Sequence, residues 1–196
     1  MANDPMYQLK DIRKDFLHGK MTTTGLDGID VTIQSGEVVA LRGPSGSGKS
    51  TLLNVLGLIE RPTGGEIIFG GHSLAKMDES HLTIIRRKAV GFIFQNFNLI
   101  PILSALENVE YALYLEDKLD PEAIRERGMN ALKAVGIENL ARNKPAEMSG
   151  GQRQRVAIAR AIVKRPHVVL ADDPTANLDS KTAASIMGLI RTLNEV

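Results

Sequence analysis

The stretch from Gly43 to Ser50, Gly-Pro-Ser-Gly-Ser-Gly-Lys-Ser, limits the possible folds of this 196-residue chain more than any other. Its spacing is that of a phosphate-binding loop. It follows the apolar run Val38–Leu41 and leads into the helix-like segment Thr51–Leu56, which is the context that the motif requires. Glycines allow a tight turn in which successive N–H groups point at phosphate oxygens, and a helix start adds unpaired N–H groups. A Gly/Ser-rich surface turn is the simpler alternative, but it explains neither flank. We therefore expect a nucleotide-binding α/β fold.

Two side chains at the end of this loop have predicted roles in binding and chemistry. Lys49 is placed to reach the β- and γ-phosphates, and the Ser50 hydroxyl is placed to ligate Mg²⁺.

Composition excludes several classes of protein. The 24 basic and 23 acidic residues give a net charge of +1, and aromatic residues make up 4% with no tryptophan. A nucleic-acid-binding surface is therefore not expected. Without cysteine, disulfides and thiolate metal sites are excluded. No apolar run approaches the roughly 18 residues of a membrane-spanning helix, and Met1 to Pro5 lacks the start of a secretory signal. Work at a membrane would require a partner protein.

The pattern of residues predicts β structure, then helices, then a return to strand. We expect strands within 7–16, 26–42, 66–69, 90–94 and 168–171, and helices over 48–58, 78–87, several pieces of 104–164, and from 180 onward. Ser104 with Glu107 has capping-box spacing, and Asp120-Pro121 is a typical helix start. Strands on both sides of a helical block indicate an α/β core, residues 1–96 and 161–196, with a helical lobe inserted at about 97–160. The whole chain, 1–196, is expected to be a single domain.

A pair of carboxylates follows the apolar strand Val168–Ala171. In a phosphate-loop fold, the first of them, Asp172, would support Mg²⁺. Asp173 would then orient or deprotonate the attacking water. A helix-capping acidic turn is the alternative, because Asp-Asp-Pro-Thr is also favourable turn chemistry.

Two further motifs are weaker on their own. Ser149-Gly150-Gly151-Gln152 precedes an amphipathic helix and could form a second anion site at its N-terminus, although a plain helix cap has the same sequence. Gln95 ends the apolar strand Val90–Phe94, where it could ligate Mg²⁺ or the attacking water and sense the γ-phosphate. A surface glutamine is the alternative.

Together these motifs resemble the ATP-binding subunit of an ABC (ATP-binding cassette) transporter, and the resemblance covers the whole chain. They occur in family order: the loop at 43–50, Gln95, the signature Ser149–Gln152, the acidic strand 168–173, and Asn177-Leu178-Asp179. The loop, the segment Gly91–Gln95 and the segment Leu103–Val109 are similar to the branch that serves lipoprotein release, macrolide export and cell division.

The resemblance implies the remaining site residues and partners. The implied nucleotide contacts are Phe16, Gly43, Ser45, Gly46, Ser47, Gly48, Lys49, Ser50, Thr51, Ser149, Gly150, Gly151, Gln152 and Asp179. Phe16 would stack on adenine, with a core position as the alternative. Ser149 and Gly151 would contact the ATP of a second copy in a head-to-tail dimer. Segment 96–110 would face an integral membrane subunit, unless its apolar residues are simply lobe core. The expected location is the cytoplasmic side of the cell membrane.

Three departures from the family pattern are apparent. Met148 replaces leucine, a volume-conserving change. Asp173 replaces the usual glutamate, so we expect slow hydrolysis with ATP binding and dimerisation retained. The chain stops at Val196, before the family's switch histidine and next strand, and its four histidines all lie earlier. We therefore expect a chain truncated at its C-terminus, with a complete protein that binds ATP but barely hydrolyses it as the alternative. The expected function is that of an ATPase or, alternatively, of an ATP-binding regulatory module.

Overall fold

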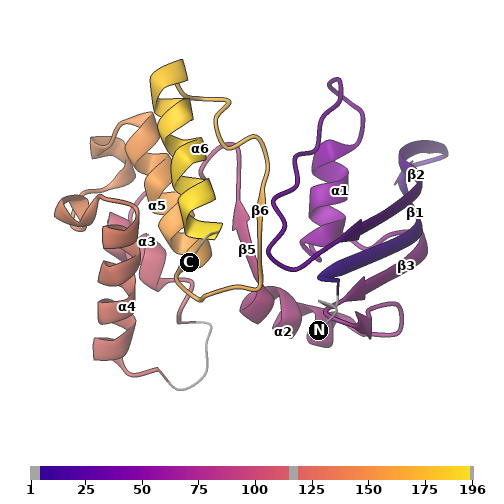
Figure 1. The fold of residues 1–196 in the computed structure, drawn as a ribbon, viewed down its shortest axis with the longest axis horizontal. Coiled ribbons are helices and arrows are strands. Elements are labelled where there is room, and N and C mark those ends of the chain that lie inside the picture. Colours follow the sequence, from indigo (N-terminus) through magenta and orange to yellow (C-terminus); the bar gives the residue numbers. More distant parts are fainter. Residues whose placement is uncertain (1–4, 115–118, 195–196) are drawn as a thin grey trace. The chain divides into compact units, whose positions relative to one another are not determined.

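Helix α2 (Glu79–Ala89) contains the boundary between two compact units, one ending at Ile84 and the other beginning at Ile85. The computed structural model describes residues 5–114 and 119–194 (Figure 1). The expectations about a signal sequence at Met1–Asp4 and about the chain end at Val196 concern residues outside these ranges. The division into a core and a lobe inserted at 97–160 stays a prediction.

The first unit is built on a four-stranded antiparallel sheet. Its strands are β1 (Tyr7–His18), β2 (Met21–Ile33), β3 (Gly64–Phe69) and β4 (His72–Ser73), in the order β2-β1-β3-β4. In β1, Tyr7 pairs with Ile33 of β2 on one side and with Phe69 of β3 on the other. The β region expected at the N-terminus is confirmed.

Helix α1 (Lys49–Leu56) follows the phosphate loop and is anchored to this sheet. The Tyr7 hydroxyl donates a 2.8 Å hydrogen bond to the carbonyl oxygen of Leu56, the last residue of the helix. The Tyr7 ring lies 4.9 Å, centroid to centroid, from that of Phe69, and burial raises the pKa of its hydroxyl. One buried aromatic therefore joins the end of the helix to the middle of the sheet.

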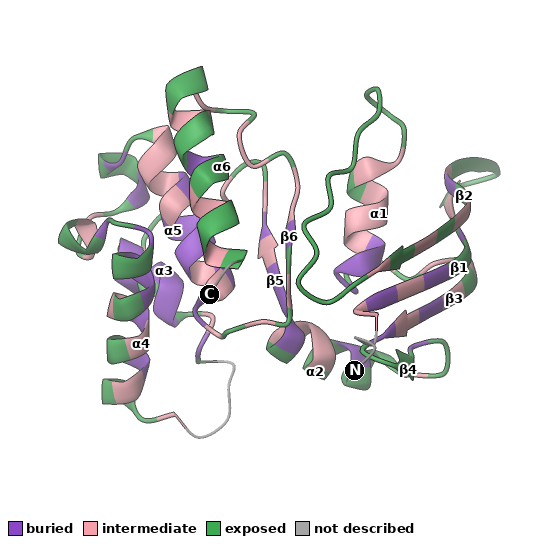
Figure 2. Ribbon diagram, in the orientation of Figure 1, coloured by how far each residue is buried: buried purple, intermediate pink, exposed green. Residues whose placement is uncertain are grey.

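The strand expected just before the phosphate loop is not formed. Residues 34–44 have no strand pairing, and Val38, Val39 and Leu41 are 66%, 44% and 39% exposed (Figure 2). An apolar run of this kind is buried when parallel strands flank it. The described strands of the first unit all belong to the antiparallel sheet, so none of them pairs with the apolar run Val38–Leu41.

The second unit contains the helices that the sequence predicted. They are α3 (Ala105–Glu110), α4 (Pro121–Ala134), α5 (Gly150–Ile162) and α6 (Ser180–Asn194), with 3-10 turns at Glu138–Leu140 and Pro145–Glu147. Ser104 and Glu107 form the expected capping box, and Asp120 caps α4 with proline in its first turn. These local signals are confirmed.

Strands β5 (Val90–Ile93) and β6 (Val168–Ala171) form a separate parallel pair in this unit. Leu170 is buried, whereas Val169 is 39% exposed. The expectation of a wholly buried acidic strand is therefore wrong in part, because β6 has a ladder partner on one side only among the described residues.

Helices α3, α4, α5 and α6 surround an apolar core that includes Val109, Leu132, Ile158 and Ile186. The buried residues of α5 include the four consecutive residues Val156–Ala159, so the middle of this helix is enclosed on all sides. Over residues 5–114 and 119–194, every helix is too short or too polar to cross a membrane.

Candidate nucleotide site

The phosphate loop closes at Gly48, the N-cap of α1, which has a left-handed backbone with φ of 89°. A Cβ on Gly48 would lie 2.5 Å from the carbonyl oxygen of Gly25 in β2, so any other residue would clash with the backbone. Gly48 therefore satisfies two demands at once, a positive φ and a close approach between loop and sheet.

The side chain of Lys49 folds back over this loop. Its ammonium group donates hydrogen bonds to the carbonyl oxygens of Gly43 at 2.9 Å and Pro44 at 2.8 Å. A Cβ on Gly43 would lie only 2.7 Å from the Ser47 hydroxyl oxygen, which shows how narrow the loop is. The positive charge thus lies where the exposed loop residues and the N-terminus of α1 meet, the arrangement that favours an anion.

Phe16 lies beside the same loop. Its ring packs against Gly25, where an added Cβ would lie 2.7 Å from the ring, and the methyl group of Thr51 lies 3.3 Å from the same point. Phe16 is half-buried. The first unit therefore contains the predicted base-stacking residue and the predicted contacts of the phosphate loop: Phe16, Gly43, Ser45, Gly46, Ser47, Gly48, Lys49, Ser50 and Thr51.

The acidic residues and Gln95 come together in the second unit. The backbone N–H of Asp172 donates to the carbonyl oxygen of Ile93 at 2.9 Å, which continues the parallel ladder by one residue. Asp172 and Gln95 therefore follow the carboxyl ends of adjacent strands, where ligands bind in α/β sheets. Asp173 is exposed and has a positive φ of 46°.

The turn that carries Gln95 is fixed by side chains from distant segments. The Asn177 amide donates to the Gln95 carbonyl oxygen at 2.9 Å. The Arg160 guanidinium donates to the carbonyl oxygens of Phe97 at 2.7 Å and Asn98 at 2.6 Å, both residues of positive φ. Burial lowers the pKa of Arg160. Sequence reasoning missed Arg160, although an arginine among the alanines and isoleucines of an amphipathic helix is a usable signal.

The signature residues begin α5 as a capping box. The N–H of Gln152 donates to the Ser149 hydroxyl at 3.3 Å, and the Gln152 side-chain oxygen accepts from the Ser149 N–H at 2.8 Å. A cavity of about 420 Å³ opens at this helix start. It is lined by Ser149, Gly151, Gln152, Arg155, Lys181, Thr182 and Ser185. The signature residues therefore do cap α5, and an open cavity with basic side chains lies beside them.

Asp179 caps the next helix. Its carboxylate accepts hydrogen bonds from the N–H groups of Lys181 at 3.1 Å and Thr182 at 3.0 Å. Hydrogen bonds from Thr182, then Lys181, lower the pKa of Asp179. The residue predicted to bind nucleotide therefore positions the first turn of α6.

The predicted Mg²⁺ ligands are a hydroxyl, an amide and a carboxylate, from Ser50, Gln95 and Asp172. Oxygen donors with few carboxylates suit Mg²⁺, which keeps several waters and takes substrate phosphates as ligands. The described residues hold no cluster of three or more His, Cys, Asp or Glu that could form a metal cage by itself. Ser50 belongs to the first unit, and Gln95 and Asp172 belong to the second, so a common Mg²⁺ site for the three stays a prediction.

A family model described as ABC transporter matches residues 26–176, which include the loop, Gln95, the signature and the acidic pair. This chain belongs to the ABC transporter family. The expected α/β cassette, with its antiparallel β region, is confirmed, and so is the branch that contains lipoprotein-release and macrolide-export ATP-binding proteins.

Relatives of this ABC chain are similar over nearly its whole length. The uncharacterized ABC transporter ATP-binding protein MJ0796 of Methanocaldococcus jannaschii is 45% identical over 193 residues, 97% of this chain and 82% of that protein. The lipoprotein-releasing system ATP-binding protein LolD of Anaeromyxobacter dehalogenans is 42% identical over 190 residues, 97% of this chain and 80% of that protein.

Solved structures agree with the sequence comparisons. The dimeric post-hydrolysis state of the ATP-binding cassette MJ0796, bound to ADP and Pi, matches the ABC chain with a TM-score of 0.88. The identity is 45%, and the match covers 97% of this chain and 83% of that one. A second dimeric structure of MJ0796 gives a TM-score of 0.89 over the same shares.

Proposed function

We propose that this chain is an ATP-hydrolysing subunit that powers an ABC-type membrane transport complex through ATP-driven dimerisation. The observation that carries the proposal is the closed loop at the start of α1, where Gly48 touches the sheet and the Lys49 ammonium lies over the loop. Membership of the ABC transporter family supports the phosphate chain of ATP as the anion.

The phosphates would be held by the N–H groups of the loop and of the first turn of α1. Lys49 would exchange its bonds to the Gly43 and Pro44 carbonyls for the β- and γ-phosphates, because charged oxygens are stronger acceptors than neutral carbonyls. Ser50, Gln95 and Asp172 would hold Mg²⁺, which supplies charge neutralisation to the β- and γ-phosphates when it is bound.

In the hydrolytic step, a water oxygen attacks the γ-phosphorus in line while the bond to the β-phosphate oxygen breaks and ADP leaves. Asp173 would orient this water and accept its proton. Its carboxylate is one methylene shorter than that of glutamate, and a displacement of about 1 Å costs roughly a hundredfold in rate. We therefore expect slow turnover with ATP binding retained.

The cavity beside the signature supports a dimer in which Ser149 and Gly151 contact ATP held by a second copy. Its lining adds the cations Arg155 and Lys181 to the N-terminus of α5, so it suits a polyanion. The dimeric structures of MJ0796 are consistent with this arrangement in the family.

The remaining partner would be an integral membrane subunit at the cytoplasmic face of the membrane. Within the proposed contact segment 96–110, Ile102 is 76% exposed, and Tyr111 and Tyr114 just beyond it are also exposed. Buried Asn108 fixes the loop, since its side-chain amide donates to the carbonyl oxygens of Ile100, Leu103 and Ser104. A fixed loop that presents apolar side chains suits a protein partner.

Phosphate release from the purified chain with Mg²⁺-ATP tests the proposal, with Lys49→Ala as control. Turnover that disappears in the control supports an ATPase. If ATP binds without turnover, the second candidate is favoured, a regulatory module whose functional state is the ATP-bound dimer. The short carboxylate of Asp173 would then explain the absence of hydrolysis. If ATP does not bind, both candidates are wrong.

A further inference from the structure

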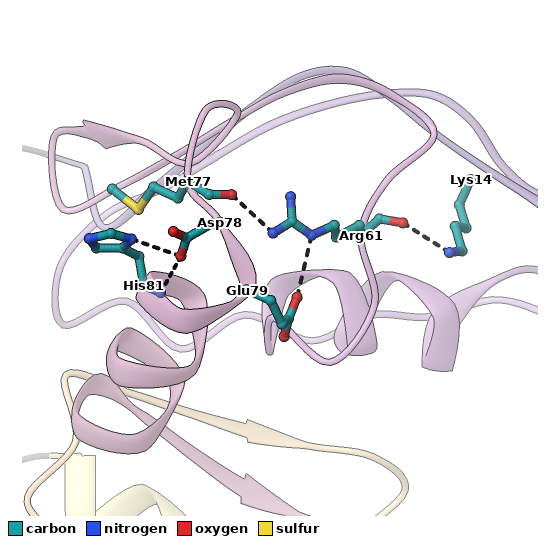
Figure 3. A network of polar contacts seen from close by, with 6 residues as sticks. All are labelled: Lys14, Arg61, Met77, Asp78, Glu79 and His81. Carbon is teal, nitrogen blue, oxygen red and sulfur yellow. Dashed lines mark hydrogen bonds and ion pairs between the residues drawn. The ribbon is translucent and has the colours of Figure 1, made fainter.

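Lys14 belongs to a polar network in the first unit that no predicted role uses. Its ammonium group forms an ion pair with the Glu60 carboxylate at 3.2 Å and donates to the Arg61 carbonyl oxygen at 2.9 Å. Figure 3 shows the second contact and the continuation of the network, in which Arg61 donates to the Met77 carbonyl oxygen and to Glu79. The Lys14 side chain is 15% exposed, so its charge is held in one place.

The same ammonium group lies over the ring of Phe16, 5.0 Å from the ring centroid. Lys14 and Phe16 are two positions apart on β1, and alternate residues of a strand share one face. A cation at this distance is attracted to the electron-rich face of an aromatic ring. The contact therefore holds the ring by one face.

The network also connects Phe16 with the helix of the phosphate loop. The backbone carbonyl oxygen of Asn54 in α1 accepts hydrogen bonds from the N–H groups of Ile59 at 2.9 Å and Glu60 at 3.2 Å. Its side-chain amide lies 3.4 Å from the Glu60 carboxylate that pairs with Lys14. The path from α1 to the aromatic ring thus runs through one carboxylate and one ammonium group.

We propose that Lys14 is a positioning residue for base binding, which holds the Phe16 ring at a fixed distance from the phosphate loop. This proposal rests on the proposed function, because it assumes that Phe16 stacks on the adenine of ATP. One face of the ring is occupied by the cation, so the base would stack on the other. A cation on the first face also draws π density away from the second, and this favours stacking of an electron-rich purine.

The test compares ATP with inorganic tripolyphosphate, which has the phosphates but no base, by titration calorimetry on the full chain. The variants are Lys14→Met, which keeps the stem without the charge, and Lys14→Arg, which keeps a cation able to pair and to lie over a ring. Lys10→Met is the matched control, because Lys10 is an exposed residue of the same strand, and its ammonium group forms no hydrogen bond or ion pair with the described residues. Thermal unfolding of each variant reports on folding.

We expect Lys14→Met to raise the Kd for ATP about fivefold and to leave the Kd for tripolyphosphate unchanged. Lys14→Arg should stay within about twofold of the parent for both ligands. In a Phe16→Ala background, Lys14→Met should have no further effect on ATP binding. These measurements separate a role of Lys14 at the ring from a role in folding, because a folding defect would raise the Kd for both ligands.

Four results would overturn the proposal. Equal weakening of both ligands by Lys14→Met would make Lys14 a structural residue, and tighter ATP binding would mean that it obstructs the ring. If the parent chain binds tripolyphosphate as tightly as ATP, Phe16 does not stack and only the base-side proposal fails. If the parent chain binds neither ligand, the proposed function fails as well.

Discussion

The side-chain amide of Asn177 donates a 2.9 Å hydrogen bond to the backbone carbonyl of Gln95, a residue 82 positions earlier in the chain. The same amide lies 3.3 Å from the side-chain oxygen of Asn96. The loop after β6 therefore holds the turn after β5, and the two loops carry Asp172, Asp173 and Gln95. Movement of one loop should therefore displace the other.

Replacing Asn177 should weaken hydrolysis without weakening ATP binding. In Asn177→Ala, the Gln95 turn loses its tether, and we expect kcat to fall roughly three- to tenfold at constant Kd for ATP. Asn177→Asp keeps the shape but places a carboxylate against the Gln95 carbonyl, so it should be at least as slow. Phosphate release and calorimetry measure the two quantities. An Asn177→Asp variant as fast as the parent would disprove the tether.

Two glycines of the loop should differ in their tolerance of alanine. Both have positive φ, 79° at Gly46 and 89° at Gly48, so each variant is strained by about 1 kcal/mol or more. A Cβ on Gly46 meets no atom within 4 Å, whereas one on Gly48 would lie 2.5 Å from the Gly25 carbonyl oxygen. We expect Gly48→Ala to lower Tm further and to abolish ATP binding. Equal effects of the two alanines on Tm and on ATP binding would contradict this account.

Lengthening the carboxylate at Asp173 should accelerate hydrolysis. Asp173→Glu restores the missing methylene, and we expect an increase of up to about a hundredfold in kcat with Kd for ATP unchanged. The positive φ at this position suits aspartate better than glutamate, so a small fall in Tm should accompany the gain. Single-turnover phosphate release is the measurement. A variant that is no faster would refute the view that the shorter carboxylate of Asp173 slows hydrolysis.

The buried carboxyl group of Glu110 should make stability depend on pH. Burial, opposed by Arg125 and assisted by Glu107, raises its pKa in the folded state. Its stabilising contribution is therefore complete below the unfolded pKa of about 4.3 and is lost as pH rises through the higher folded value. Glu110→Gln should raise Tm at pH 7 but not at pH 4. The exposed Glu126→Gln is the control, and a parallel shift in both variants would argue against burial as the cause.

The signature serine can be tested without destroying its helix cap. Asparagine and aspartate both cap helices well, so Ser149→Asn and Ser149→Asp should fold with similar Tm values. The aspartate adds a negative charge beside the proposed γ-phosphate of a second copy. We expect it, far more than the asparagine, to prevent ATP-dependent dimerisation, measured by light scattering. Equal dimerisation in both would exclude Ser149 from the interface.

Local signals in the sequence predicted local structure well. The capping residues Ser104, Asp120 and Ser149 begin helices, and the glycine pattern of the loop gives the closed turn before α1. These features depend on neighbours within a few residues, so their chemistry can be read from the chain.

What the sequence did not predict depends on partners far away along the chain. Val38–Leu41 has the composition of a buried strand, but strand formation also requires an adjacent strand, and composition does not specify one. Similarly, Arg160 donates to backbone carbonyls 62 and 63 positions away in the sequence. Lys14 donates to the carbonyl oxygen of Arg61, which is 47 positions away. Carbonyl acceptors are present at every residue, so no sequence pattern marks them.

The antiparallel pairing of β1 with β2 bears on the order in which the chain acquires its shape. The pairing of β1 with β2 begins at His18 and Met21, next to the turn, and needs no residue after Ile33. The pairing of Tyr7 with Phe69 requires that the chain be synthesised as far as β3. Hairpins form in microseconds, but synthesis proceeds at about 5–20 residues per second. On a ribosome, the β1–β2 hairpin could therefore form before Gly48 emerges, so the loop would close against β2 before β3 and β4 complete the sheet.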